Sequence, residues 1–276
     1  MPTKPPSAAP WTAGSRSERR PVVMRQRTYT TEGLVIRQFP LGEADRILTI
    51  FTQDMGKVRL VAKGVRRPKS KLGGHLELLY QVSFSAAYGR NLDVVNEAQT
   101  VQRFAEISED LDRLSRAVYM CELVDSFSAE RSASYSLYQH IIASLTALCS
   151  TDDTWLLVRH FEAQLLGVTG FRPELRLCVE CGTDLAPADH VFDVSSGGVV
   201  CPNCQVQGLS AVLPVQLNAM KVLRLLQRER TFASVAGVRV TPPVRHDVER
   251  LLTTHIRYVV ERALKSADFV RQVSEL

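Results

Sequence analysis

The sequence predicts an α+β protein of several domains. It has an N-terminal five-stranded OB-fold barrel and a C-terminal helical bundle that carries an inserted four-cysteine module. Three observations support this prediction. Short strand patterns fill the part of the chain before Ser108, apolar residues recur at helical spacing after it, and two Cys-x-x-Cys pairs interrupt the helical part.

Length and composition are those of a globular protein. The chain has 276 residues, of which 45% are hydrophobic and 23% charged, and it contains no run of 18 apolar residues that could cross a membrane. Residues 1–28 are rich in Pro, Ser, Ala and Arg and have no periodicity, so we expect a disordered basic extension there. This stretch also lacks the apolar segment of a secretory signal.

Residues 29–105 are expected to form the barrel. Five strand patterns are separated by turns, and they cover Thr31–Gln38, Arg46–Thr52, Lys57–Lys63, Leu76–Tyr88 and Leu92–Val101. Five strands of this length in so short a segment favour an OB-fold, with an SH3-like barrel as the alternative.

The helical bundle is expected in two halves, residues 106–175 and residues 213–276. Leu111, Leu114, Val118 and Cys121 follow a single helical face, and similar stripes continue to Gly167. Pro214 would occupy the first turn of the next helix, and a last helix would begin near Pro242.

Residues 176–212 are expected to form a separate metal module. Cys178-Val179-Glu180-Cys181 and Cys201-Pro202-Asn203-Cys204 are two Cys-x-x-Cys pairs at a separation typical of structural zinc sites. We therefore predict one structural zinc ion held by Cys178, Cys181, Cys201 and Cys204, with no open position for catalysis. A redox dithiol pair, a disulfide staple and an iron–sulfur cluster are the alternatives.

Positive charge is concentrated at the N-terminal end. The net charge is +5 overall, and residues 29–103 carry eleven basic against seven acidic residues. A run without any acidic residue supplies the candidates for DNA phosphate contact: Lys57, Arg59, Lys63, Arg66, Arg67, Lys69 and Lys71. The alternative is an ordinary solvated polar face.

Motifs of known enzymes are missing from the sequence. It contains no P-loop, no Gly-x-Ser-x-Gly and no His-Glu-x-x-His, and its six histidines are scattered. Glu43 and Asp45 could hold Mg²⁺ in a nuclease, but two carboxylates are a weak signal. We therefore predict a binding protein without enzymatic activity, small-molecule substrate or membrane attachment.

Several segments resemble the RecO family of bacterial DNA repair proteins. They are Gly33-Leu34-Val35-Ile36, Leu41-Gly42-Glu43-Ala44-Asp45-Arg46, Ala62-Lys63-Gly64-Val65-Arg66-Arg67 and Leu166-Gly167-Val168-Thr169-Gly170-Phe171-Arg172-Pro173. The resemblance extends from about Tyr29 to the C-terminus, and residues 1–28 depart from it.

The resemblance implies a recombination mediator of the RecF pathway in the bacterial cytoplasm, associated with the nucleoid. Such a protein would bind single- and double-stranded DNA, anneal complementary strands, associate with RecR and help load RecA. It would also bind the acidic C-terminal tail of the single-strand-binding protein, for which Lys221, Arg224 and Arg228 are candidates at helical spacing. The alternatives are a zinc-ribbon OB-fold factor that binds RNA or protein in transcription or translation, and the nuclease.

Overall fold

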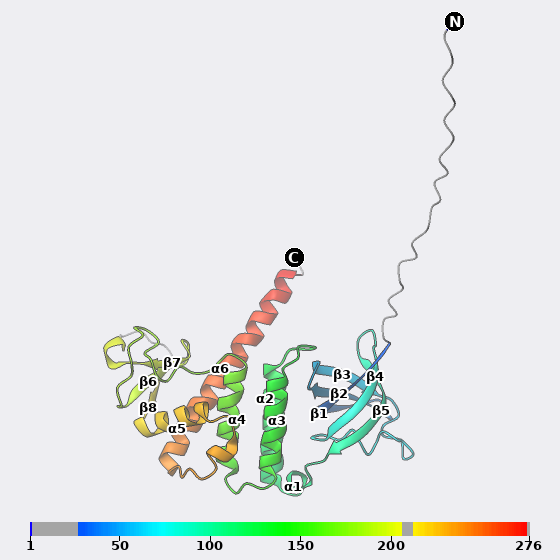
Figure 1. Ribbon diagram of the computed structural model, residues 1–276, viewed down its shortest axis with the longest axis horizontal. Helices are drawn as coiled ribbons and strands as arrows, with labels where there is room; N and C mark the ends of the chain where they lie inside the picture. Colours follow the sequence, from blue (N-terminus) through cyan, green and yellow to red (C-terminus); the bar gives the residue numbers. More distant parts are fainter. Residues whose placement is uncertain (2–26, 206–211, 275–276) are drawn as a thin grey trace.

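The computed structural model describes Met1, residues 27–205 and residues 212–274, with side chains as far as Glu261. A barrel, a group of helices and a small sheet follow one another along an elongated molecule (Figure 1). The predicted N-terminal extension lies almost wholly outside the described residues. Within the described helices, no segment is both long and apolar enough to span a bilayer.

The N-terminal strands close into a five-stranded barrel. They are β1 (Thr28–Leu41), β2 (Asp45–Thr52), β3 (Gly56–Ala62), β4 (Gln81–Ala87) and β5 (Asp93–Gln102), in the order β1-β2-β3-β5-β4. β1 closes the barrel by pairing with both β2 and β4, and β3 pairs with β5 in parallel. This confirms the predicted OB-type barrel.

The fourth strand is shorter than predicted. Residues 76–80 of the expected strand Leu76–Tyr88 lie in the connection before β4, where Leu79 has a φ of 66°. A left-handed residue ends an extended run, because its neighbours can no longer continue the pleat. Leu76 and Leu79 are nevertheless buried. Their apolar side chains resemble the pattern of a strand, which explains why the predicted strand begins too early.

Alternation along the strands gives the barrel two apolar faces. The inner face includes Leu48, Ile50, Leu60 and Phe84 in a core of its own. The outer face contributes Leu34, Ile36 and Phe51 to a second core that continues through the helices. The barrel is therefore covered on one side by the helical part of the chain.

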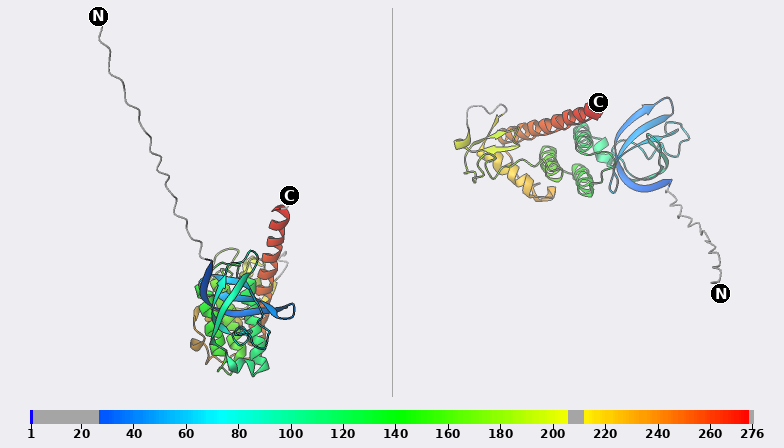
Figure 2. Two further views of the ribbon diagram at one scale, coloured as in Figure 1. Left: turned by 90° about the vertical axis from the view of Figure 1, so that its right-hand side faces the viewer. Right: turned by 90° about the horizontal axis from the view of Figure 1, so that it is seen from above.

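The helical part is made of six helices in the described residues. They are α1 (Ala105–Ser108), α2 (Leu111–Phe127), α3 (Tyr135–Leu148), α4 (Thr154–Val168), α5 (Leu217–Arg228) and α6 (Pro242–Ser274). Asp110 caps α2 by accepting from the backbone N–H of Asp112 and Arg113, and Asp153 caps α4 in the same way through Leu156. The views in Figure 2 show α2 and α3 next to the barrel and α6 extending away from the body of the molecule.

The cysteine-bearing segment forms a three-stranded sheet at the end opposite the barrel. Its strands are β6 (His190–Asp193), β7 (Gly198–Val200) and β8 (Val212–Val215), in the order β7-β6-β8. The prediction that Pro214 begins a helix is wrong, because Pro214 lies in β8 opposite Val191 and α5 begins at Leu217. Proline lacks an N–H, so an edge strand accommodates it.

The barrel is fastened to the helices by charge as well as by apolar packing. Asp125 of α2 accepts from Lys57 Nζ at 2.8 Å and from Arg37 Nη1 at 2.6 Å. Burial would raise the pKa of Asp125, but the hydrogen bonds from Lys57 and Arg37 outweigh it and hold that pKa below its usual value.

The barrel also approaches the connection after α2 closely at Gly56. This residue, with a φ of 68°, has no room for a Cβ, because that atom would lie 2.0 Å from the carbonyl oxygen of Ser132.

A buried ion pair holds α2, α4 and α6 together. Glu162 is fully buried and accepts from Tyr119 Oη at 2.7 Å, while Arg159 Nη2 lies 3.0 Å from the same carboxylate. Burial raises the pKa of Glu162 to about 7, although Arg159 and Tyr119 oppose that shift. Arg159 also faces Glu249 of α6, at 3.6 Å.

Replacing Glu162→Ala should lower the free energy of unfolding by about 3–5 kcal/mol, because the buried charge of Arg159 would keep only the more distant, half-exposed Glu249 as a partner. The double variant Arg159→Met with Glu162→Leu should be more stable than the single variant, since an apolar pair needs no counter-charge. Urea unfolding followed by circular dichroism measures both. A double variant no more stable than Glu162→Ala would contradict this account of the ion pair.

Candidate metal centre and nucleic-acid interface

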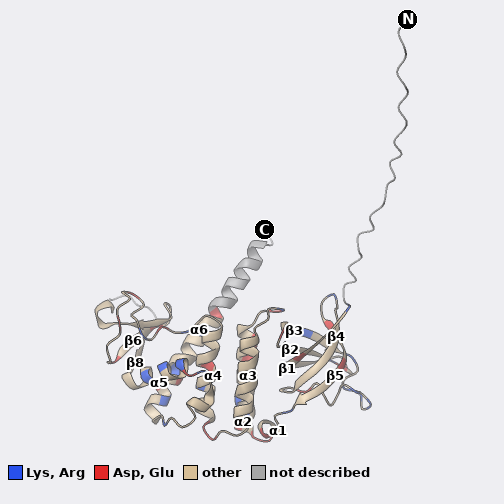
Figure 3. Cartoon of the chain, viewed as in Figure 1, with Lys and Arg blue, Asp and Glu red and all other residues tan. Residues whose placement is uncertain are grey.

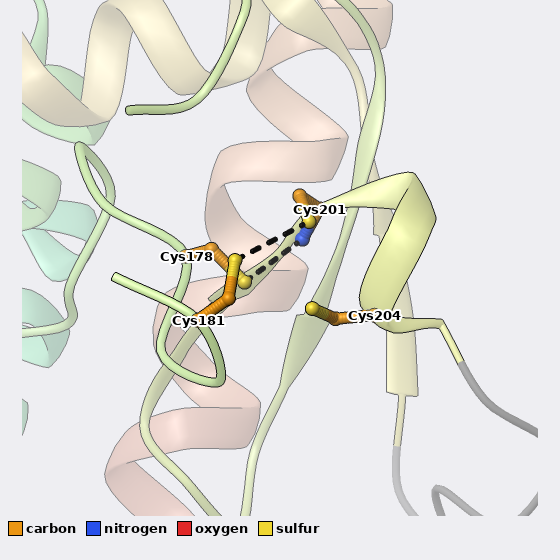
Figure 4. A group of neighbouring side chains, drawn as sticks. All are labelled: Cys178, Cys181, Cys201 and Cys204. Carbon is orange, nitrogen blue, oxygen red and sulfur yellow. Dashed lines mark hydrogen bonds between the residues drawn. The ribbon is translucent and has the colours of Figure 1, made fainter. Parts of the chain in front are cut away.

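The structure brings the four predicted cysteines together. The sulfur atoms of Cys178, Cys181, Cys201 and Cys204 all lie within 4.8 Å of one another, and they converge from two loops (Figure 4). The sulfurs of Cys181 and Cys201 are 3.8 Å apart. Four sulfurs at ~2.3 Å from one tetrahedral zinc ion would be about 3.8 Å apart, so the cluster has the size that such a site needs.

Each cysteine pair lies on a tight turn. In the first, Gly182 N–H donates to the carbonyl of Cys178 at 2.9 Å, and Gly182 has a φ of 72° that favours glycine. In the second, Cys204 N–H donates to the carbonyl of Cys201 at 3.0 Å, within the short 3-10 turn η1 (Pro202–Cys204). Backbone hydrogen bonds, which the Cys-x-x-Cys spacing permits, therefore set the geometry of both loops.

The surroundings of the sulfurs favour thiolates at some positions and oppose them at others. Burial would raise the pKa of Cys178, but hydrogen bonds from the backbone of Cys201, Cys181 and Glu180 lower it to about 6. Hydrogen bonding with Cys181 and Cys201 raises the pKa of Cys204 to about 12. Cysteines bind a metal ion as thiolates, so a bound cation would draw the proton from any cysteine of the cluster that still carries one.

The basic run divides into two parts in the structure. Lys57 and Arg59 lie on β3 and face the helices, where Lys57 binds Asp125 and Arg59 lies 3.8 Å from Glu130. The remaining five residues are exposed in the connection after β3 and form what we call the basic loop: Lys63, Arg66, Arg67, Lys69 and Lys71. Within the described part of the chain, no ion pair neutralises these five side chains.

The basic loop is held against the turn between β1 and β2. Arg66 N–H donates to the carbonyl of Ala44 at 3.0 Å, and Gly64 N–H donates to Asp45 Oδ1 at 2.7 Å. Asp45, one of the two carboxylates considered for Mg²⁺, thus supports the loop. Among the described residues, only the four cysteines form a group of three or more metal-ligating side chains.

The three residues predicted to bind an acidic tail lie on α5, which carries several basic positions (Figure 3). Lys221 is exposed, whereas Arg224 donates to the carbonyl of Leu175 and Arg228 pairs with Glu229 at 2.8 Å. Arg224 therefore joins α5 to the cysteine-bearing segment.

A groove of about 820 Å³ was not predicted from the sequence. It lies between α3, α4 and the segment around Phe232, and Arg172 and Arg230 contribute to its lining. Inside it, His160 is buried and its Nδ1 has no hydrogen-bond partner among the described residues, while its Nε2 lies 2.8 Å from the carbonyl of Glu229. The groove could not be recognised from the sequence, because the residues that line it come from distant parts of the chain and the histidines are scattered.

Comparison with known proteins agrees with this architecture. Residues 24–104 match the family described as Recombination protein O N terminal, and residues 108–268 match Recombination protein O C terminal. The chain is 36% identical to a DNA repair protein RecO of Dehalococcoides mccartyi strain CBDB1, over 86% of this chain and 93% of the relative.

Two further relatives carry the same name. The protein of Roseiflexus sp. strain RS-1 is 36% identical over 92% of this chain and 88% of its own length. That of Bifidobacterium adolescentis is 33% identical over 86% of this chain and 97% of its own length. The predicted resemblance and the prediction of a non-enzymatic repair protein are both confirmed. The barrel, the helices and the four-cysteine cluster thus belong to one architecture, and the chain is a member of the Recombination protein O (RecO) family of DNA repair proteins.

Proposed function

We propose that this chain is a recombination mediator that binds single- and double-stranded DNA and anneals complementary strands. In this role it associates with RecR and helps load RecA onto DNA coated by the single-strand-binding protein, in the bacterial cytoplasm at the nucleoid. The observation that carries the proposal is the exposed basic loop, whose five cationic side chains have no ion-pair partner in the described structure. Annealing needs such a surface, because two polyanions approach only when their charge is screened.

The contacts to DNA are assigned chiefly to the basic loop. Lys57 is bound to Asp125 and its side chain is only 14% exposed, so it supports the junction with the helices more than it could support DNA. Arg59 is half-exposed and remains available at the edge of the surface. Phosphate contacts of this kind carry no sequence information, so we expect little sequence preference.

We further propose that the four cysteines hold one structural zinc ion. The size of the cluster and the lowered pKa of Cys178 support this assignment. Bound zinc would supply folding energy to a segment whose strands are only three or four residues long. It would have no role in the DNA contacts, because the cluster and the basic loop lie at opposite ends of the molecule (Figure 1).

The acidic tail of the single-strand-binding protein is assigned to the groove between α3 and α4. The groove combines an apolar wall at Phe232 with the positive charge of Arg172 and Arg230. Of the three predicted residues on α5, Arg224 is bound to the carbonyl of Leu175, and Arg228, although exposed, is paired with its neighbour Glu229, which leaves Lys221 unpaired. The acidic tail would contact the two cations of the groove.

The rival functions are distinguished by simple assays. An RNA-binding factor would bind matched RNA more tightly than single-stranded DNA, whereas the proposed mediator would bind and anneal DNA. A nuclease would cleave labelled DNA in the presence of Mg²⁺, and the engagement of Asp45 with Gly64 speaks against that role.

Neutralising Arg66, Arg67, Lys69 and Lys71 together should weaken binding to all DNA sequences alike and slow annealing. If about four phosphates are contacted, log affinity for a single strand should fall with log salt at a slope of roughly −3, and the variant should flatten that slope. Salt titrations on several unrelated oligonucleotides measure both effects. The matched control neutralises Arg176, Lys221, Arg228 and Arg239, which are also exposed but lie outside the barrel. An unchanged slope in the loop variant would place the DNA site elsewhere.

Replacing Cys201→Ser should reduce the zinc content from one ion per chain and lower the solubility of the protein, because three thiolates hold zinc less tightly than four. Elemental analysis of protein purified without chelator measures the metal. Cys149→Ser, which changes a half-buried cysteine outside the cluster, is the control and should keep its zinc. Wild-type protein with four free thiols and no zinc would disprove the assignment.

Reversing the charge at the groove with Arg230→Glu should weaken binding of the acidic tail peptide by roughly ten-fold or more. Lys221→Glu, an equal change of charge on α5, should have a much smaller effect. Fluorescence anisotropy with a labelled peptide of the tail compares the two variants. The reverse order of effects would return the tail site to α5.

A further inference from the structure

The hairpin of β1 and β2 extends beyond the closed part of the barrel. β4 pairs with β1 only between Thr28 and Leu34, so the segment from Arg37 to Leu41 pairs with β2 alone. Gly42, with a φ of 59°, begins the turn that leads into β2. In this segment Arg37 and Gln38 are engaged with Asp125 and Arg46, whereas the side chains of Phe39 and Leu41 are exposed and can contact a ligand.

Two apolar side chains near the tip of this hairpin are exposed, and the turn beyond them carries the exposed carboxylate of Glu43. Phe39 is 47% exposed and Leu41 is 41% exposed. The guanidinium of Arg37 lies 5.0 Å from the centre of the Phe39 ring, so the ring is held by a cation on one side and remains accessible to solvent. About half of the Phe39 surface is therefore left uncovered by the protein and can contact a ligand.

A small cavity next to Phe39 connects the hairpin with the basic loop. The cavity has about 260 Å³ and is lined by Gln38, Phe39, Pro40, Arg46 and Arg66. Arg46 is fixed by Gln38 and by Glu77, at 3.1 and 2.8 Å, whereas Arg66 is exposed at the start of the basic loop. The hydrogen bond from Arg66 N–H to Ala44 keeps this wall of the cavity attached to the hairpin.

We infer that the hairpin tip binds an unpaired nucleobase, which stacks on Phe39 while Arg66 and the rest of the basic loop hold the neighbouring phosphates. The inference rests on the proposed DNA-binding function and adds a preference to it. Bases of a duplex are already stacked on one another, whereas those of a single strand offer a free face. Phosphate contacts alone would bind both forms of DNA, and Phe39 would favour the single strand.

The charge of the surroundings selects this occupant over an apolar protein segment. Arg37 beside the ring is already paired with Asp125, so the unpaired positive charge next to the accessible ring is that of the basic loop at Arg66. A polyanion with flat aromatic groups at regular intervals satisfies both features at once. A protein partner without negative charge would match the exposed aromatic ring but not the positive charge.

The test compares Phe39→Ala, Phe39→Trp and, as a matched control, Tyr88→Ala. Tyr88 is an equally exposed ring of the same barrel, but it lies in the connection between β4 and β5 and packs against Tyr29 and Arg131. Each protein is titrated with an unstructured single strand, with the same strand made of abasic nucleotides, and with a duplex. Unfolding midpoints establish that the variants remain folded, which the exposure of Phe39 favours.

Phe39→Ala should bind the single strand roughly five- to a hundred-fold more weakly than wild type, with an unchanged salt slope and unchanged duplex affinity. Phe39→Trp and Tyr88→Ala should bind as wild type. On the abasic strand, wild type and Phe39→Ala should be equal, because no base remains to stack.

Unchanged single-strand affinity in Phe39→Ala, or an equal loss on the duplex and the abasic strand, would overturn the inference and leave the hairpin tip as a protein contact. An equal loss in Tyr88→Ala would also overturn it, since the effect would not be specific to the hairpin. Failure of the proposed DNA site itself is seen separately, as an unchanged salt slope when the basic loop is neutralised.

Discussion

The packing of the barrel's outer face against α2 and α3 is the constraint on which the arrangement of the whole molecule depends. Leu34, Ile36 and Phe51 point away from the barrel interior and are buried in the core of the helices. A small barrel with one apolar outer face must cover it, and here the same chain supplies the cover. The contact of Gly56 with Ser132 shows how closely the two parts approach.

This junction decides which basic residues of the barrel are paired with carboxylates and which remain unpaired. On β3, Lys57 is paired with Asp125 of α2, and the half-exposed Arg59 lies 3.8 Å from Glu130 in the connection between α2 and α3. Desolvation makes such pairing necessary, since a buried Lys57 without a carboxylate would be costly. The charge that remains for a polyanion is consequently displaced to the basic loop, next to the β1–β2 hairpin.

The fold was predictable from the sequence where a local pattern determines it, and less so where distant segments meet. Alternation predicted the strands of the barrel, and the cysteine spacing predicted the cluster, because both signals lie within a few residues. The prediction that a strand begins at Leu76 was wrong because buried leucines in a loop resemble the alternation of a strand. The prediction that a helix begins at Pro214 was wrong because proline fits both a first helical turn and an edge strand. The groove at His160 and the separate role of Lys57 depend on tertiary contacts, which no short window of sequence contains.

The four-cysteine segment is part of the helical core, although it was expected to form a separate module. Phe192, Val199 and Cys201 belong to the same cluster of buried side chains as the helices. Backbone carbonyls of this segment and its flanks are bound by side chains of distant helices: Arg224 binds Leu175, Arg250 binds Pro214 and His255 binds Phe171. Metal at the cysteines would therefore stabilise α5, α6 and the approach to the groove, which shares Arg172 with the segment before the first cysteine pair. The barrel has its own core and lies beyond α2 and α3, so the proposed DNA contacts would be separable from metal binding, whereas the groove would share its structural support with the cysteine-bearing segment.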